Sequence, residues 1–256
     1  MRTLICLLFV LLTTAPARAQ KAIAPGDPSL HADRIRPFTD TIALLKTPRD
    51  SAQRLLGTLV RRVERTQSKG VPIFRETQHY VLENWDEVDT LDVSAATLAP
   101  LRIVEISTKS GHTLDLGGRR MTGTVWSADS GKRAVDAPLP APFFHGMMTE
   151  AFIAALPLAE GSTLPLSVAE TPDIEVRTAE FRVTGSAILH TAGGPVECFV
   201  VREGERTTGW VSKEDGHLVR LHWTTPDGTE IWKLPKRDVP YVMSVDAAGT
   251  PERPTG

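Results

Sequence analysis

The chain has 256 residues, of which 41% are hydrophobic and 23% charged, and its formal net charge is −2. A chain of this length can bury an apolar core without the help of disulfides. Its basic residues are scattered, with only pairs such as Arg61-Arg62, so it lacks the basic field that nucleic-acid binding needs, and we expect no nucleic-acid partner.

The N-terminus has the pattern of a secretory signal peptide. Arg2 precedes an apolar run from Leu4 to Leu12, and Ala17-Arg18-Ala19 is a small-x-small cleavage site. The apolar run is shorter than the ~20 residues of a membrane-spanning helix, and no later segment approaches that length. We expect residues 1–19 to be removed and the mature protein to be periplasmic or extracellular, with no integral membrane segment.

The mature chain is expected to form one domain. Residues 20–32 and 246–256 are rich in Pro, Ala or Gly without periodicity, which predicts flexible ends around a half-barrel-like β domain over residues 33–245. Cys6 lies in the predicted signal peptide, so Cys198 has no internal disulfide partner. We expect Cys198 to be a small side chain of the core.

Short strands are predicted from the start of this domain. Asp40–Leu45, Leu55–Thr66 and Val71–Leu82 are β-rich and are separated by turn residues. A short helix over Ser51–Arg62 is the rival interpretation of the second of these segments. Gly57-Thr58 is poor helix interior, which favours the strand.

An acidic segment follows, from Asn84 to Val93. Asp86, Glu87, Asp89 and Asp92 suggest calcium, but they lack the ligand spacing and the glycine of a calcium loop. We therefore expect a solvated loop or an edge strand here, and no metal.

Phe143–Leu156 is the best helix of the mature chain. Three further strands precede it, at Leu101–Thr108, His112–Leu116 and Arg120–Trp126. Within the segment, apolar side chains recur at helical spacing, and Pro157 ends it.

The chain then returns to a β pattern. Leu164–Val168 and Ile174–Leu189 are predicted strands, and Pro195–Leu234 contains four short runs separated by Gly-bearing turns, as in an antiparallel meander. The prediction is a mainly β fold of about eleven strands. They would form a curled antiparallel sheet or incomplete β-barrel, with the one helix packed on its concave side.

The sequence shows no catalytic motif. GxSxG, HExxH, Walker A, Rossmann glycine and paired CxxC patterns are all absent from it. The seven histidines lack the close pairing of zinc ligands. We expect no enzyme, no catalytic residues, no metal and no cofactor.

Large aromatic and methionine side chains are the best indication of a binding site. Methionine suits surfaces that adapt to varied apolar ligands, although an ordinary core is the alternative. The candidate ligand-binding residues are Trp126, Phe143, Phe144, Met147, Met148, Phe152, Trp210 and Trp223.

Several short runs resemble an exported bacterial family, the domain of unknown function 3108. They are Thr97–Arg102, Ala155–Leu158 followed by Gly161, Cys198–Val201, Gly209–Lys213 and Gly216–Arg220. The similarity spans about residues 33–234. That family is similar in architecture to the LolA/LolB lipoprotein carriers, which implies an incomplete barrel around an apolar cavity. The resemblance supplies no catalytic set. This sequence has one predicted helix, whereas the carriers have several.

The first functional hypothesis is therefore an exported protein that binds or carries a lipid-like apolar ligand between sheet and helix. The alternative is an envelope protein-interaction module, because exposed strand edges recruit partners. An unrecognised hydrolase is the third hypothesis, and it requires a polar cluster in the cavity.

Overall fold

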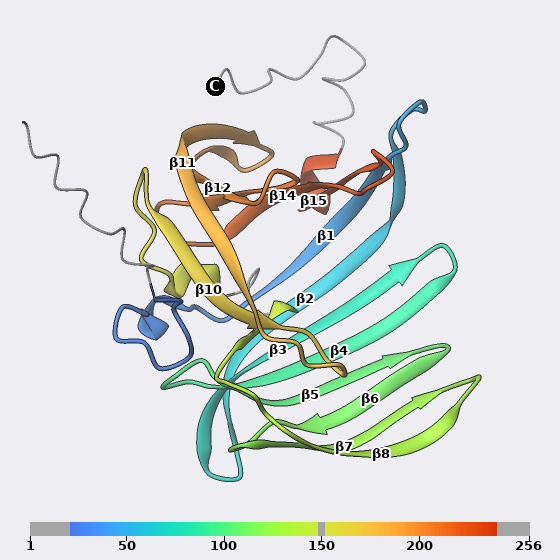
Figure 1. Ribbon diagram of the computed structural model, residues 1–256. Helices are drawn as coiled ribbons and strands as arrows, with labels where there is room; N and C mark the ends of the chain where they lie inside the picture. The colour runs from blue at the N-terminus through green and yellow to red at the C-terminus, as the bar shows by residue number, and fades with distance from the viewer. Residues whose placement is uncertain (1–20, 148–151, 240–256) are drawn as a thin grey trace, which may run out of the picture.

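Fifteen strands make up one sheet in the computed structural model, which describes residues 21–147 and 152–239 (Figure 1). The predicted signal peptide and the tail from residue 246 lie outside these residues. The strands are β1 (Phe38–Thr47), β2 (Arg54–Ser68), β3 (Val71–Leu82), β4 (Trp85–Ser94), β5 (Pro100–Ser107), β6 (Ser110–Asp115), β7 (Arg120–Ser127), β8 (Gly131–Pro138), β9 (Phe144–His145), β10 (Thr163–Ala169), β11 (Arg177–Thr191), β12 (Gly194–Glu203), β13 (Thr207–Ser212), β14 (Leu218–Thr224) and β15 (Glu230–Pro235).

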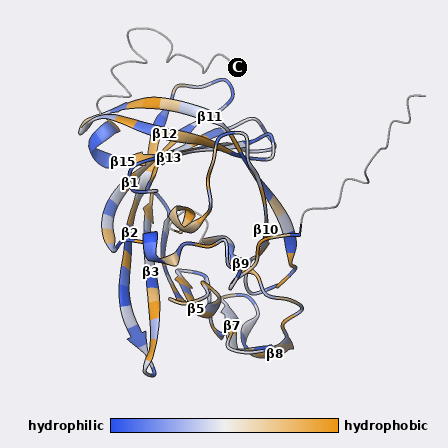
Figure 2. Ribbon diagram, turned by 90° about the vertical axis from the view of Figure 1, so that its left-hand side faces the viewer, coloured by the Kyte–Doolittle hydropathy of each residue, from blue (hydrophilic) through white to orange (hydrophobic). Residues whose placement is uncertain are grey.

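The order of the strands is that of two meanders joined at one seam. β8 to β1 run in sequence from one edge, β1 pairs with β15, and β15 to β9 run back to the other edge. All pairs are antiparallel except β9 with β10. Figure 2 shows that the two halves, β1–β8 and β9–β15, bend toward each other.

Alternation of buried and exposed side chains sets the two faces of the sheet. In β2, Leu59, Arg61 and Val63 are at most 1% exposed, whereas Val60 between them is 39% exposed. Strand side chains alternate between faces, so one face of β2 points inward. We call the face that carries Leu59, Arg61 and Val63 the inner face.

The main apolar core lies on the inner face and joins the two halves. Within this core, Phe74 of β3 contacts Phe152, with ring centroids 5.7 Å apart. Other members include Val63, Leu91, Ile103, Leu114, Phe144, Leu166, Phe181, Val201 and Val211.

Short 3-10 turns and the N-terminal segment complete this core. η1 (Ala32–Arg34) lies beside η2 (Ile153–Ala155), and the amide of His31 donates to the carbonyl of Ala155 at 2.8 Å. Ile23 forms a parallel bridge with Leu166 of β10. The remaining short element, η3 (Lys236–Asp238), follows β15.

The predicted fold class needs correction. The mainly β prediction is confirmed, but the structure is one open sheet of fifteen strands, not an incomplete barrel of about eleven with a helix on its concave side. β4 accounts for part of the difference in strand number, because its acidic sequence suggested a solvated loop or an edge strand. It is an interior strand between β3 and β5.

The predicted helix over Phe143–Leu156 is also wrong. Phe144–His145 is strand β9, only Gly146 and Met147 are α-helical among the described residues of this range, and Ile153–Ala155 is the 3-10 turn η2, while residues 148–151 lie outside the described part. Both Phe143 and Phe144 are buried, although neighbours in a strand point to opposite sides. A segment buried on more than one side is apolar throughout, and its spacing then cannot distinguish a helix from other packing.

No helix within residues 21–147 and 152–239 has the length and apolar character to cross a membrane. Cys198 is fully buried with a free thiol, as predicted, and burial raises its pKa to about 11.

Candidate functional site

The seven predicted ligand-binding residues that the structure describes do not all gather at one site. Phe143, Phe144 and Phe152 are buried, and Met147 is half-buried against the main core. Met148 lies outside the described residues. The other three are tryptophans.

The three tryptophans lie in different places. Trp126 lies on β7, beside Gly111 of β6. Trp210 stacks on Trp232 with ring centroids 6.0 Å apart. Of the seven candidates that the structure describes, Trp223 alone lines a cavity of about 510 Å³.

This cavity lies against the second half of the sheet. Its apolar wall consists of Ile153, Phe181, Val201, Leu218, Leu221 and Trp223. Small residues of β13 give it room, namely Thr207 and Gly209. Its volume falls within the ~300–1,000 Å³ of small-molecule sites.

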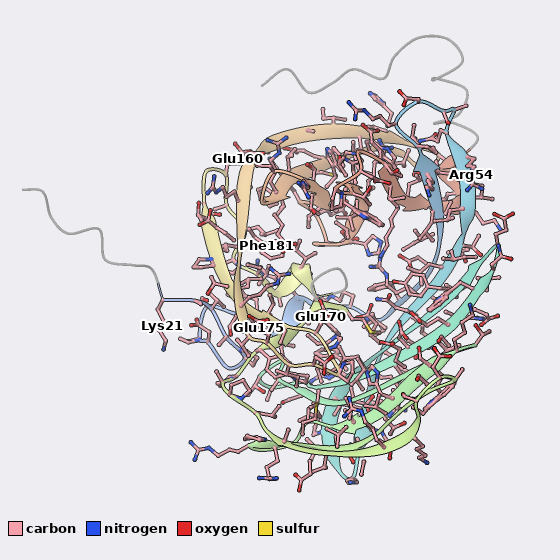
Figure 3. The ribbon with its side chains drawn as sticks, turned by 45° about the vertical axis from the view of Figure 1, so that its right-hand side comes forward. Lys21, Arg54, Glu160, Glu170, Glu175 and Phe181 are labelled. Atoms are coloured by element: carbon pink, nitrogen blue, oxygen red, sulfur yellow. The ribbon has the colours of Figure 1, made fainter. Side chains whose placement is uncertain are left out.

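Charged side chains also line the cavity. Arg177 donates to Glu203 at 3.2 Å, and the Arg177 side chain is 57% exposed, so this pair lies at the solvent side. Lys233 is only 8% exposed, and its Nζ lies 5.6 Å from the Tyr80 ring and 5.7 Å from the Trp223 ring. Figure 3 shows Phe181 and Glu170 inside the curve of the sheet and Lys21 outside it.

An acidic group on the inner face of β3–β5 is the second part of the site. Asp89 of β4 is directly opposite Glu105 of β5 and Gln78 of β3. Glu87 is two residues from Asp89 on the same face, and Glu76 is diagonal to it, opposite Leu91. We call Glu76, Glu87, Asp89 and Glu105 the acidic row.

The Gln78 side chain, directly opposite Asp89, makes its hydrogen bonds along β3. The Tyr80 hydroxyl donates to Oε1 of Gln78 at 2.6 Å, and Nε2 of Gln78 donates to Oε1 of Glu76 at 2.7 Å. Both ends of the Gln78 amide are thus used on its own strand. Within the described residues, the buried Oδ1 of Asp89 has no hydrogen-bond partner.

Burial and like charges raise the pKa values of Asp89, Glu105 and Glu87 in this row. Burial raises the pKa of Asp89 to about 8, with the charges of Glu87, Glu105 and Glu76 adding to the rise. Burial likewise raises the pKa of Glu105 to about 7, helped by Glu87 and Glu170. The pKa of Glu87 is also raised by burial, against a hydrogen bond from Trp85.

Two histidines connect the row to the other half of the sheet. Nε2 of His112 in β6 lies 2.8 Å from the Thr171 hydroxyl, and Nε2 of His145 lies 3.1 Å from the same oxygen. Burial lowers the pKa of both rings, that of His145 to about 4 with help from His112. Both rings are therefore neutral near pH 7, and Nδ1 of His112 lies 3.9 Å from Glu105.

The acidic row and the cavity adjoin one another. Glu170 lines the cavity, and its charge raises the pKa of Glu105. Lys233 also lines the cavity, and its Nζ lies over the ring of Tyr80, which starts the hydrogen-bond chain along β3. The arrangement can therefore hold a molecule with an apolar body and a polar end.

A different polar pair lies on the inner face of β1 and β2. Arg61 donates to Asp40 through Nη2 at 2.9 Å, and Nε2 of His217 lies 3.4 Å from Asp40. Burial would raise the pKa of Asp40, but the hydrogen bond with His217 and the charge of Arg61 lower it overall. Asp40 and His217 also line a second cavity of about 540 Å³, whose lining is more polar.

No group of three or more His, Cys, Asp or Glu side chains in the described part of the chain is arranged to hold a metal ion.

The sequence prediction treated the acids of β4 as solvated. The signal that was available is their spacing, since Glu87 and Asp89 are two apart and must share a face once the segment is a strand.

The family comparison gives a match over most of the chain. A family model described as "Protein of unknown function (DUF3108)" matches residues 58–241, which include β3–β5 and every strand that lines the cavity. None of the curated proteins matches the chain.

Proposed function

Because the chain belongs to the DUF3108 family, whose description assigns no function, we propose from its own geometry that it is a binding protein for an amphipathic, lipid-like molecule. The apolar part of the ligand would lie in the cavity of about 510 Å³ against β11–β14. The signal-peptide pattern of residues 1–19 supports export, so the proposed binding would occur in the periplasm or outside the cell.

The cavity carries this proposal. Six apolar side chains surround a space of ligand size next to charged groups, which is the usual composition of a small-molecule site. Burying an alkyl chain gains ~0.8 kcal/mol per CH₂, so a chain of about ten carbons offers enough free energy to offset the cost of association. The site differs from the predicted one, since its wall is the sheet and not a helix.

Filling the cavity tests the proposal. Thr207 lines the cavity, and Thr207→Trp should occupy it and weaken binding of dodecanol at least tenfold, measured by calorimetry and by native mass spectrometry. Thr208→Trp is the matched control, because Thr208 is on the other face of β13 opposite His222. Equal binding by both variants, or no binding by the natural protein, would contradict the proposal.

Hydrolysis is the second candidate function. Asp89 and Glu105 are adjacent carboxyls whose pKa values of about 8 and about 7 suit proton transfer near neutral pH. Turnover of chromogenic esters or glycosides that is lost in Glu105→Gln would favour this rival. Under our proposal no turnover is expected.

A further inference from the structure

The proposed function does not specify the polar end of the ligand, and the acidic row indicates what that group is. Asp89 is the central member of the row. It is 8% exposed, and its Oδ1 has no hydrogen-bond partner within residues 21–147 and 152–239. A buried polar atom without a partner costs free energy. A ligand that donates a hydrogen bond to Oδ1 of Asp89 would recover that free energy on binding.

Building on the proposed function, we propose that Glu87, Asp89 and Glu105 bind the positively charged amine of a ligand whose apolar part lies in the cavity. Directly opposed residues of an antiparallel pair have Cβ atoms about 4.5–5.5 Å apart. Asp89 and Glu105 are such a pair, and Glu87 is on the same face. One ammonium group between them would receive charge-assisted acceptors on several sides.

Three neighbouring arginines already serve other acids, and Lys233 of the cavity has its Nζ over the Tyr80 and Trp223 rings. Arg61 donates to Asp40, and Arg177 donates to Glu203. Arg75 binds both oxygens of Asp92 at 2.6 and 2.8 Å, on the outer face of β3 and β4. Every cause of the shift at Asp89 and Glu105 raises the pKa, so the charge that would hold these carboxyls ionised has to come with the ligand.

The chemistry of the row selects an organic amine. An anionic head group would be repelled by Glu87 and Glu105. A metal ion needs several converging ligands, and no set of three His, Cys, Asp or Glu side chains in the described chain provides them. The cavity next to the row supplies the apolar surface that an alkylamine needs and a metal ion does not.

Three probes with the same alkyl chain test this inference. Dodecylammonium, dodecanol and dodecanoate, all below their micellar concentrations, are titrated into the full mature protein by calorimetry. We expect dodecylammonium to bind at least tenfold more tightly than dodecanol, and dodecanoate to bind most weakly. The double variant Asp89→Asn, Glu105→Gln should lose the preference for the amine and keep the affinity for dodecanol.

The control is Asp86→Asn, on the outer face of β4, where the Asp86 side chain is 60% exposed. It should keep the preference, and circular dichroism should show that all variants are folded. Equal binding of amine and alcohol, or a preference that survives the double variant, overturns the inference while the proposed function stands. If no probe binds the natural protein, the proposed function fails, and the inference fails with it.

Discussion

The inner face of the sheet carries two aspartates that differ in how their charge is balanced. Asp40 in β1 has Arg61 directly opposite it in β2, and its pKa is lowered although burial acts against this. Asp89 in β4 has Glu105 directly opposite it in β5, and its pKa is raised to about 8. The same strand geometry therefore makes a closed ion pair in one place and an incomplete polar site in the other.

This contrast distinguishes a carboxylate that stabilises the sheet from carboxyls that serve a function. A buried carboxylate that has its own arginine needs nothing further, so Asp40 and Arg61 stabilise the sheet near its seam. A group of carboxyls without a cation costs stability, and folded proteins keep such groups mainly at sites of function. The comparison therefore points to β3–β5 as the functional part.

Breaking the closed pair should give the largest effect. Arg61 is 1% exposed, so Arg61→Met leaves Asp40 buried with less compensation and should lower the free energy of unfolding by about 3–5 kcal/mol in urea. Adding Asp40→Asn should recover part of that loss. Arg62→Met, at a side chain 63% exposed, is the control and should change it by about 0.5 kcal/mol or less. An Arg61→Met effect as small as the control would show that the pair is not important for stability.

The acidic row should appear in the pH dependence of stability. Asp89 keeps its proton to about pH 8 when folded but loses it near pH 3.8 when unfolded. The contribution of Asp89 to the free energy of unfolding is therefore full below pH 3.8. It falls by about 1 kcal/mol per pH unit as the pH rises toward 8. Asp89→Asn should remove this slope.

Urea denaturation between pH 4 and pH 9 measures that slope. The variant should match the natural protein near pH 4 and exceed it at pH 9, where the natural protein has to ionise a buried carboxyl. Asp86→Asn, on the outer face, should leave the slope as it is. A natural protein whose stability is flat over this range would show that Asp89 ionises freely.

Removing the Thr171 hydroxyl, which lies between the two histidines, should have the smallest effect on the free energy of unfolding. Thr171→Val removes the partner of both His112 and His145 and should cost about 1–2 kcal/mol, because two buried ring nitrogens lose a hydrogen bond. Thr178→Val, at an exposed position of β11, is the control. Since both rings are neutral, the loss should not depend on salt, whereas that of Arg61→Met should. Salt dependence at Thr171 would contradict neutral rings.

The sequence predicts strands better than it predicts the side of the sheet on which a residue lies. β2 and β3 are predicted within two residues of their ends, because apolar and polar side chains alternate there. β4 fails because Glu87 and Asp89 are acidic at positions that face inward, where apolar residues are usual. The inner face is decided by the pairing of β4 with β3 and β5, which the sequence of β4 alone does not contain.

The candidate site was predictable only in part. Trp223 was identified because large aromatic side chains often line cavities. Phe181, Leu218 and Leu221 come together only when β11 to β15 are placed side by side, so no local pattern in the chain marks them. Phe144 and Phe152 were predicted ligand-binding residues because they are large and aromatic, and in the structure they pack in the main core.

The pairing of β1 with β15 has a consequence for how the protein is made. The two partners are almost the whole domain apart in sequence, so this ladder closes a long loop and forms after the shorter hairpins on either side of it. Until the last strand is available, β1 and β14 each expose an unsatisfied edge to other chains. The middle of the sheet is therefore completed only when β15, the last strand of the domain, pairs with both β1 and β14.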